Sequence, residues 1–243
     1  MSCLTLSRTG RYLASGQKNF MGFTADIIVW DLATQQMHKK LSLHKVMIQS
    51  LAFSHDETKL ASLGGPDDGS LVLWDVASGE AICGSPADNK FVECVKFLNN
   101  DSNRLMTAGQ GTQHGFVMKE RDALLSQSKL MVDAGNIHVW EYLASINKLK
   151  SAAMELGKVV RWFSCVAISQ DDSCIFAGSK SGDLLQINLK RNVLRRTGPK
   201  KQLSGGITAV ANTSDPHSIL IGTGDGLLAL MRVPEEVSTC SAC

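Results

Sequence analysis

The chain has 243 residues, with 44% hydrophobic and 20% charged side chains and a formal net charge of +2. This balance is typical of a globular protein that can bury a substantial core, and the small charge argues against nucleic-acid binding. No apolar run reaches the length of a membrane span and no signal-peptide pattern opens the chain, so the seven dispersed cysteines are expected to be reduced thiols in the cytoplasm.

A tripeptide that ends in Trp-Asp or Trp-Glu recurs along the chain. It stands at 29–31, 73–75 and 139–141, and the first two copies are 44 residues apart. The equivalent positions of two further units, Ile187 and Met231, are also 44 residues apart. A period of about 40–45 residues is typical of WD repeats, each of which forms one blade of a β-propeller. The sequence therefore predicts an all-β propeller of about five blades, a fold that usually binds partners.

Three short strands are expected in each unit, because apolar or β-branched runs alternate with Gly, Asn, Asp and Ser. The first strands are predicted at 3–7, 50–54, 94–98, 165–169 and 208–212. The second strands are predicted at 12–16, 59–63, 104–108, 174–178 and 218–222, and the third at 26–30, 70–74, 136–140, 183–187 and 227–231.

The propeller is predicted to span residues 1–233 and to be followed by a tail at 234–243. The chain opens directly on a first strand, without the outer strand that usually closes the ring, so the propeller is expected to be incomplete or open. Two interpretations remain. The chain is part of a longer propeller protein, or it is a self-sufficient five-bladed ring or open arc whose strand edges invite association.

An insertion interrupts the third unit. Trp74 and Trp140 are 66 residues apart, and removal of residues 112–135 restores the period. Within the insertion, Val117, Leu124 and Met131 recur every seven residues, which predicts one face of a helix. The helix is either an arm that binds a partner or an insertion without a role.

The second unit shows how a blade is expected to be held together. Resemblance to WD repeats implies that His44, Ser62, Asp68 and Trp74 form the hydrogen-bonded structural tetrad of that family, and buried polar groups of these types need such partners. A hydrolase triad is the disfavoured alternative, because no nucleophile elbow surrounds the serine. The first unit carries Thr24 where the second has Asp68, so its tetrad is expected to be incomplete.

Other chemical signals are weak, and no cofactor, metal or catalytic residue is predicted. Cys240 and Cys243 have the spacing of half a zinc site, but no second pair lies nearby. The glycine-rich segments at 109–112 and 222–226 lack the Lys-Ser/Thr of a phosphate-binding loop.

Two loops are candidates for partner binding. The loop at 17–24 carries Phe20, Met21 and Phe23, and exposed hydrophobic residues can mark an interface. The alternative is that these side chains pack over the neighbouring blade. The turn at 64–69 is longer than a tight hairpin needs and carries Asp67.

Several stretches are more specific than a propeller requires, namely 14–17 with 20–31, LASLGGPDDGSLVLWD at 60–75, and 81–87. Together they resemble the first propeller of the cilia- and flagella-associated protein 52 family, strongly over 2–111 and more weakly over 136–233. The resemblance implies a non-enzymatic structural protein of motile cilia. Such a protein lies inside axonemal doublet microtubules, contacts tubulin and other axonemal proteins, and binds no nucleic acid, membrane or small-molecule substrate. A cytoplasmic WD-repeat adaptor that recruits a peptide or client protein is the alternative.

Overall fold

The computed structural model describes residues 1–20, 22–87, 91–110 and 137–233. Every regular element in these residues is a β-strand, and the strands form five separate antiparallel sheets. The first sheet contains β1 (Cys3–Leu6), β2 (Tyr12–Gly16), β3 (Thr24–Asp31) and β4 (Gln36–Lys45). The second contains β5 (Ile48–Phe53), β6 (Lys59–Gly64), β7 (Ser70–Asp75) and β8 (Ala81–Pro86).

The remaining sheets repeat this order. The third contains β9 (Val92–Phe97), β10 (Arg104–Gly109), β11 (Ile137–Leu143) and β12 (Lys148–Ala153). The fourth contains β13 (Phe163–Ile168), β14 (Cys174–Ser179), β15 (Leu184–Asn188) and β16 (Val193–Gly198). The fifth contains β17 (Ile207–Asn212), β18 (Ser218–Thr223) and β19 (Leu228–Arg232).

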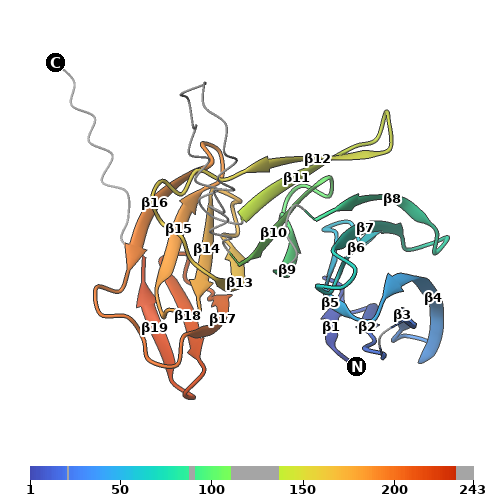
Figure 1. Ribbon diagram of the computed structural model, residues 1–243, viewed down its shortest axis with the longest axis horizontal. Coiled ribbons are helices and arrows are strands. Elements are labelled where there is room, and N and C mark those ends of the chain that lie inside the picture. The colour runs from blue at the N-terminus through green and yellow to red at the C-terminus, as the bar shows by residue number, and fades with distance from the viewer. Residues whose placement is uncertain (21, 88–90, 111–136, 234–243) are drawn as a thin grey trace, which may run out of the picture.

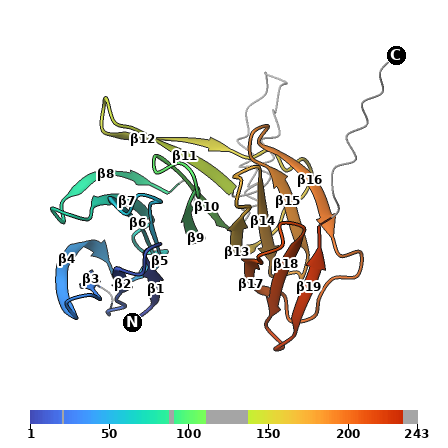
Figure 2. The same ribbon diagram turned by 180° about the vertical axis from the view of Figure 1, so that it is seen from behind.

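The sheets are the blades of an open β-propeller. In each sheet the strands pair in chain order, and the first strand of one sheet packs against the first strand of the next. Figures 1 and 2 show the blades fanning out from this inner row, with the first and fifth blades at opposite ends. The ring is not closed, as the sequence predicts.

The core lies between the blades rather than inside any one of them. Ile27 of the first sheet packs with Leu51 and Trp74 of the second, and similar clusters join the later pairs of sheets. A two-layered sheet interface of this kind buries apolar faces that a single sheet would leave in water. Each blade is therefore stabilised mainly by its neighbours.

The two ends of the arc expose the apolar side chains that a further blade would cover. Leu4 and Leu6 of β1 are 51% and 55% exposed, and Leu228 and Leu230 of β19 are 71% and 65% exposed. In the interior of the arc, the corresponding faces are buried.

The strands predicted from sequence are present, with ends that differ by at most three residues. The outer strands β4, β8, β12 and β16 were not predicted, because their side chains are mostly exposed or half-buried and carry no regular apolar pattern. The predicted helical insertion at 112–135 and the tail at 234–243 lie outside the described residues. Among the described residues, no helix occurs.

A hydroxyl contact is repeated at two blade junctions. Ser2 Oγ lies 2.6 Å from the carbonyl oxygen of Ile48 in the next blade. Ser164 Oγ makes the same contact with the carbonyl oxygen of Ile207. Gly16 and Gly178 allow this close approach, because a Cβ atom at either position would lie within 2.8 Å of two side-chain atoms of the adjoining strands.

Substitution of these glycines should therefore loosen the blade junctions. Gly16→Ala and Gly178→Ala are each expected to lower the free energy of unfolding by about 1–3 kcal/mol, the usual effect of overpacking. Urea denaturation monitored by tryptophan fluorescence measures the change. Gly84→Ala is the matched control, because its Cβ would make only ordinary contacts of 3.7 Å. An equal effect of all three variants would contradict the steric explanation.

Candidate functional site

His44 connects the first blade to the second. It lies near the end of β4, while its partners lie on β6, on β7 and in the turn between them. Its Nε2 is 2.6 Å from Ser62 Oγ, and its Nδ1 contacts the carboxylate of Asp68. Trp74 donates its indole N–H to the same Ser62 Oγ at 2.7 Å. The structure thus brings together all four residues of the predicted tetrad, and the tetrad spans two blades.

The order Asp68–His44–Ser62 imitates a hydrolase triad, but the serine is inaccessible. Ser62 is 0% exposed and His44 is 1% exposed, so no substrate carbonyl can reach the hydroxyl. The Ser62 oxygen also accepts the indole hydrogen bond, which reduces its availability as a nucleophile. These bonds satisfy buried polar groups.

Parts of the tetrad recur in two other blades. Trp30 donates to Ser15 Oγ at 3.2 Å in the first blade, and Trp140 donates to Thr107 Oγ1 at 2.9 Å in the third. Thr24 stands in the first blade at the position of the acidic residue, as the sequence indicates. The indole–hydroxyl bond is therefore the recurrent element of this propeller.

The fourth blade uses an ion pair instead. Arg161 Nε donates to Asp183 at 2.7 Å, and the hydroxyls of Ser179 and Ser181 also donate to this carboxylate. Burial alone would raise the pKa of Asp183, but the hydrogen bonds from Ser179 and Arg161 outweigh it, so the pKa lies below its usual value. The carboxylate is thus held ionised inside the blade.

The propeller has two loop-bearing faces. Face A carries the connections after the second strands and before the first strands, which include 17–23, 46–47, 65–69, 154–162, 180–183, 199–206 and 224–227. Face B carries the turns after the first strands and after the third strands, at 7–11, 32–35, 54–58, 76–80, 98–103, 144–147, 169–173, 189–192 and 213–217.

The predicted partner-binding residues that the structure describes lie on face A. Phe20 and Phe23 are 86% and 65% exposed, so they do not pack over a neighbouring blade. Asp67 is also exposed. Met21 and the insertion residues Val117, Leu124 and Met131 lie outside the described residues.

Face A carries a further cluster that was not predicted from the sequence. The Lys180 ammonium lies 3.6 Å from the centre of the Trp162 ring and 3.0 Å from the Glu93 carboxylate. Trp162 also donates its indole N–H to Glu93 at 2.9 Å, and Gln49 donates to the other carboxylate oxygen. These residues come from three blades, so sequence spacing gives no signal for the cluster. Its aromatic and charged groups border the inner strands, where a peptide could bind.

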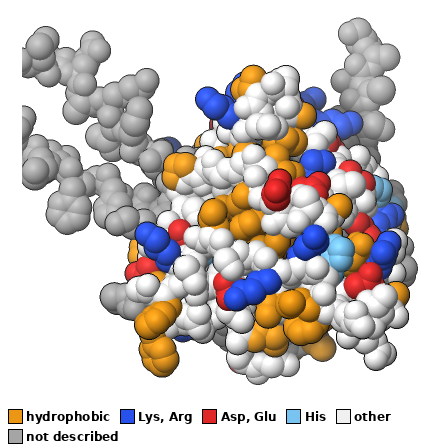
Figure 3. Space-filling model, turned by 90° about the vertical axis from the view of Figure 1, so that its right-hand side faces the viewer, with side chains coloured by type: hydrophobic (Ala, Val, Ile, Leu, Met, Phe, Trp, Pro, Cys, Tyr) orange, Lys and Arg blue, Asp and Glu red, His pale blue; other side chains and the backbone are white. Residues whose placement is uncertain are grey.

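The side of the molecule that carries β4 and β8 shows no broad patch of one charge sign. Figure 3 shows basic, acidic and hydrophobic side chains interspersed on this side. No segment of the described residues is a helix long and apolar enough to cross a membrane, and no cluster of three potential metal ligands occurs among them.

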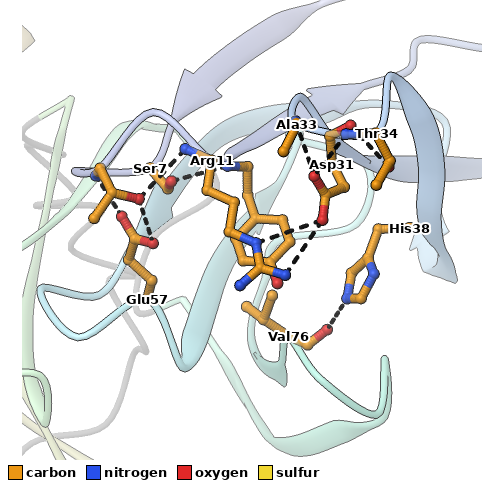
Figure 4. A network of polar contacts seen from close by, with 10 residues as sticks. Ser7, Arg11, Asp31, Ala33, Thr34, His38, Glu57 and Val76 are labelled. Carbon is orange, nitrogen blue, oxygen red and sulfur yellow. Dashed lines mark hydrogen bonds and ion pairs between the residues drawn. The ribbon is translucent and has the colours of Figure 1, made fainter.

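On face B, polar contacts join the first two blades a second time (Figure 4). Glu57 of the second blade accepts hydrogen bonds from the backbone N–H and the hydroxyl of Thr9. His38 of β4 lies 3.1 Å from the carbonyl oxygen of Val76. Burial acts to raise the pKa of Glu57, but the two bonds from Thr9 more than offset it and the pKa is lowered. The first blade is therefore tied to the second on both faces.

Within the first blade, Asp31 organises the turn after β3. Its carboxylate accepts the backbone N–H groups of Ala33 and Thr34 and pairs with Arg11 at 3.4 Å (Figure 4). Burial acts to raise the pKa of Asp31, but the backbone N–H groups of Thr34 and Ala33 and the charge of Arg11 outweigh it, so the pKa is lowered. This is the aspartate of the first Trp-Asp pair, so the pair has a local structural function.

Comparison with known proteins agrees with this geometry. The model of the WD domain, G-beta repeat, matches residues 35–75. The β-propeller domain of Cps50 (Swd1) from Myceliophteria thermophila superimposes with a TM-score of 0.73, covering the whole chain and 68% of that domain, at 17% identity. At that identity the match concerns the fold alone. Fold and repeat together define an open WD-repeat β-propeller.

Sequence similarity shows which WD-repeat proteins the chain is related to. The chain is 47% identical over 96% of its length to Cilia- and flagella-associated protein 52 of Chlamydomonas reinhardtii. It is 37% identical over 96% of its length to the Homo sapiens protein of the same name. The chain is thus homologous to cilia- and flagella-associated protein 52, which confirms the predicted resemblance. It spans about a third of these relatives, 34% of each.

Removal of the central hydroxyl of the tetrad should destabilise the propeller. Ser62→Ala leaves two buried ring nitrogens, of His44 and Trp74, without their partner. We expect the free energy of unfolding to fall by about 2–4 kcal/mol, since an orphaned buried polar group costs ~1–3 kcal/mol. Ser15→Ala is the matched control, because half-buried Trp30 can bond to water instead, and about 1 kcal/mol or less is expected. Chemical denaturation measures the free energy of unfolding of both variants. Equal losses of this free energy would show that the difference in burial between Trp74 and Trp30 is not the cause.

Asp183 should make stability depend on pH. Because its pKa is lower in the folded than in the unfolded chain, the ionised carboxylate stabilises the fold above its ordinary pKa of 3.8, and this stabilisation is lost as pH falls through the folded pKa. Asp183→Asn is expected to cost about 1–3 kcal/mol at pH 7. The difference from the wild type should shrink between pH 5 and about pH 2 in urea titrations. A constant difference across this range would show that ionisation is irrelevant.

Proposed function

We propose that the chain is a non-enzymatic structural module of motile cilia. The observation that carries this proposal is the similarity to cilia- and flagella-associated protein 52 over 96% of the chain, at 47% identity to the Chlamydomonas reinhardtii protein and 37% to the Homo sapiens protein. The tetrad supports a structural rather than a catalytic role, because its serine and histidine are closed to solvent.

The propeller suits attachment to a repeating lattice. Its blades hold face-A and face-B loops in fixed positions, and weak contacts made at several loops add up when the partner surface repeats. The finer proposal is that the module lies inside the axonemal doublet microtubule and contacts tubulin and other axonemal proteins, as the family resemblance implies.

Phe20 and Phe23 are the described residues best placed for such contacts. Both are largely exposed, and a monomeric protein gains nothing from leaving two phenylalanines of one loop in water. Asp67, in the neighbouring blade, adds an acidic group on the same face.

An adaptor that binds a client peptide is the second candidate. The cluster of Glu93, Trp162 and Lys180 favours it, because an aromatic ring with adjacent charges of both signs can grip an extended peptide. The two candidates differ in how firmly the protein is held in the axoneme.

Extraction of axonemes distinguishes the two functions. A tagged chain expressed in ciliated cells is expected to stay with the doublet microtubules after detergent and high-salt washes, because a protein inside the lumen is shielded from the wash. An adaptor bound through surface charges would be released as salt screens its contacts. Complete release in the first salt wash would refute the luminal proposal.

Substitution of the exposed aromatics tests the contact surface. Phe20→Asp with Phe23→Asp is expected to reduce axonemal incorporation several-fold, while the free energy of unfolding from urea titration stays within about 0.5 kcal/mol of the wild type, as is usual for surface positions. Ile146→Asp is the matched control, because Ile146 is 57% exposed on face B. Equal incorporation of both variants would exclude the phenylalanine loop as a contact.

A further inference from the structure

A cavity lies on face B, beside the inner row of strands. It measures about 650 Å³, within the range of about 300–1,000 Å³ that is usual for ligand-binding pockets. Its lining comes from β1, β5 and β9 and from the turns that follow the first strands of the first four blades. Packed sheets therefore hold its walls, and it is separate from the phenylalanine loop on face A.

The charged side chains that line this cavity are all basic. Arg8, His55 and Lys96 are among the described residues of its wall, and no Asp or Glu is. A lysine is unusual at this level of an inner strand, because the equivalent positions of β1 and β5 carry the smaller, uncharged side chains of Thr5 and Ala52. The sequence thus places an extra cation where the neighbouring blades have none.

The cations of the cavity lack a counter-charge. Lys96 is exposed and forms no ion pair with another described residue, whereas Glu93 on the same strand is paired with Lys180 on face A. Arg8 is also exposed and without an ion pair in this part of the chain, and its Nη1 lies 3.3 Å from Nε2 of His55. A concave wall of one charge sign strengthens the local field, so the cavity attracts anions.

Two carboxylates contact residues of the wall, and both are engaged in holding its turns. Asp172 accepts the backbone N–H groups of Asn99 and Asn100 at 2.9 and 2.7 Å. Asp56 accepts the hydroxyl of Ser54 at 2.6 Å. These carboxylates shape the turns around the cavity, and neither pairs with its cations.

The rest of the lining indicates what kind of anion fits. Leu6, Phe53 and Leu98 belong to the wall, and Leu6 is 55% exposed. A small inorganic anion would contact the cations but leave this apolar surface in water. A peptide can place carboxylates on the cations and cover the apolar wall with its backbone and side-chain carbons.

We propose that the face-B cavity binds a peptide segment rich in Asp and Glu, with its carboxylates on Lys96 and Arg8. The segment crosses the ends of the inner strands of the first three blades. This site lies on the opposite face from Phe20 and Phe23, so it stands or falls independently of the contact proposed for that loop.

Fluorescence anisotropy with a fluorescein-labelled oligoglutamate peptide tests the proposal on the full chain. At an ionic strength of about 0.15 M, Lys96→Ala is expected to weaken binding about tenfold, the usual effect of losing a hydrogen bond to a charged group. Lys148→Ala is the matched control, because it removes the same charge from an exposed position beside the face-B turn at 144–147, outside the cavity. A change of less than about twofold is expected there. Equal effects of the two variants would overturn the proposal.

Two further measurements separate peptide recognition from other causes. Lys96→Arg keeps the charge and is expected to retain most of the affinity; a loss equal to that of Lys96→Ala would contradict recognition through charge. Inorganic phosphate at constant ionic strength is expected to leave the peptide bound. Displacement by phosphate would show a site for small anions, and equal binding of an oligolysine peptide would show unspecific adhesion; either result would overturn the proposal.

Discussion

The buried imidazole of His44 fixes how the first two blades fit together. Its two nitrogens contact Ser62 and Asp68 in the second blade, while its own strand belongs to the first. A buried ring with both nitrogens paired tolerates little displacement, because any shift leaves a polar group without a partner. The apolar contacts between the sheets supply most of the stabilisation, and this polar contact specifies the one arrangement in which they form.

The fixed angle between blades positions everything else on the molecule. Because the inner strands pack in chain order, the loops of face A come from segments that are distant in sequence yet adjacent in space. Glu93 and Lys180 meet across 87 positions of the chain. The candidate binding groups are therefore held by the sheets rather than by local loop structure, which agrees with a scaffold whose contacts must match a rigid partner.

The predictability of the fold follows from how each feature is encoded. The inner three strands of each blade could be predicted because buried strands carry apolar runs. The tetrad could be predicted because the second unit resembles a WD repeat, and that resemblance implies these four residues. The outer strands were not predicted because much of their surface is exposed to water, so their sequences carry no regular apolar pattern. The place of His44 on β4 emerges only from the pairing of β4 with β3. The Glu93–Trp162–Lys180 cluster depends on the packing of the third blade against the fourth and leaves no local signal.

The open arc has a consequence for cooperativity. In a closed ring every blade has two neighbours, whereas here the first and fifth blades each have one. Such a row behaves as a linear array with nearest-neighbour coupling, in which the terminal units fray before the interior. The third blade has a neighbour on each side, and each of these neighbours has a second neighbour of its own. The third blade is therefore expected to unfold last. Whatever caps the two exposed ends would raise the stability of the whole row by removing the sites at which unfolding starts.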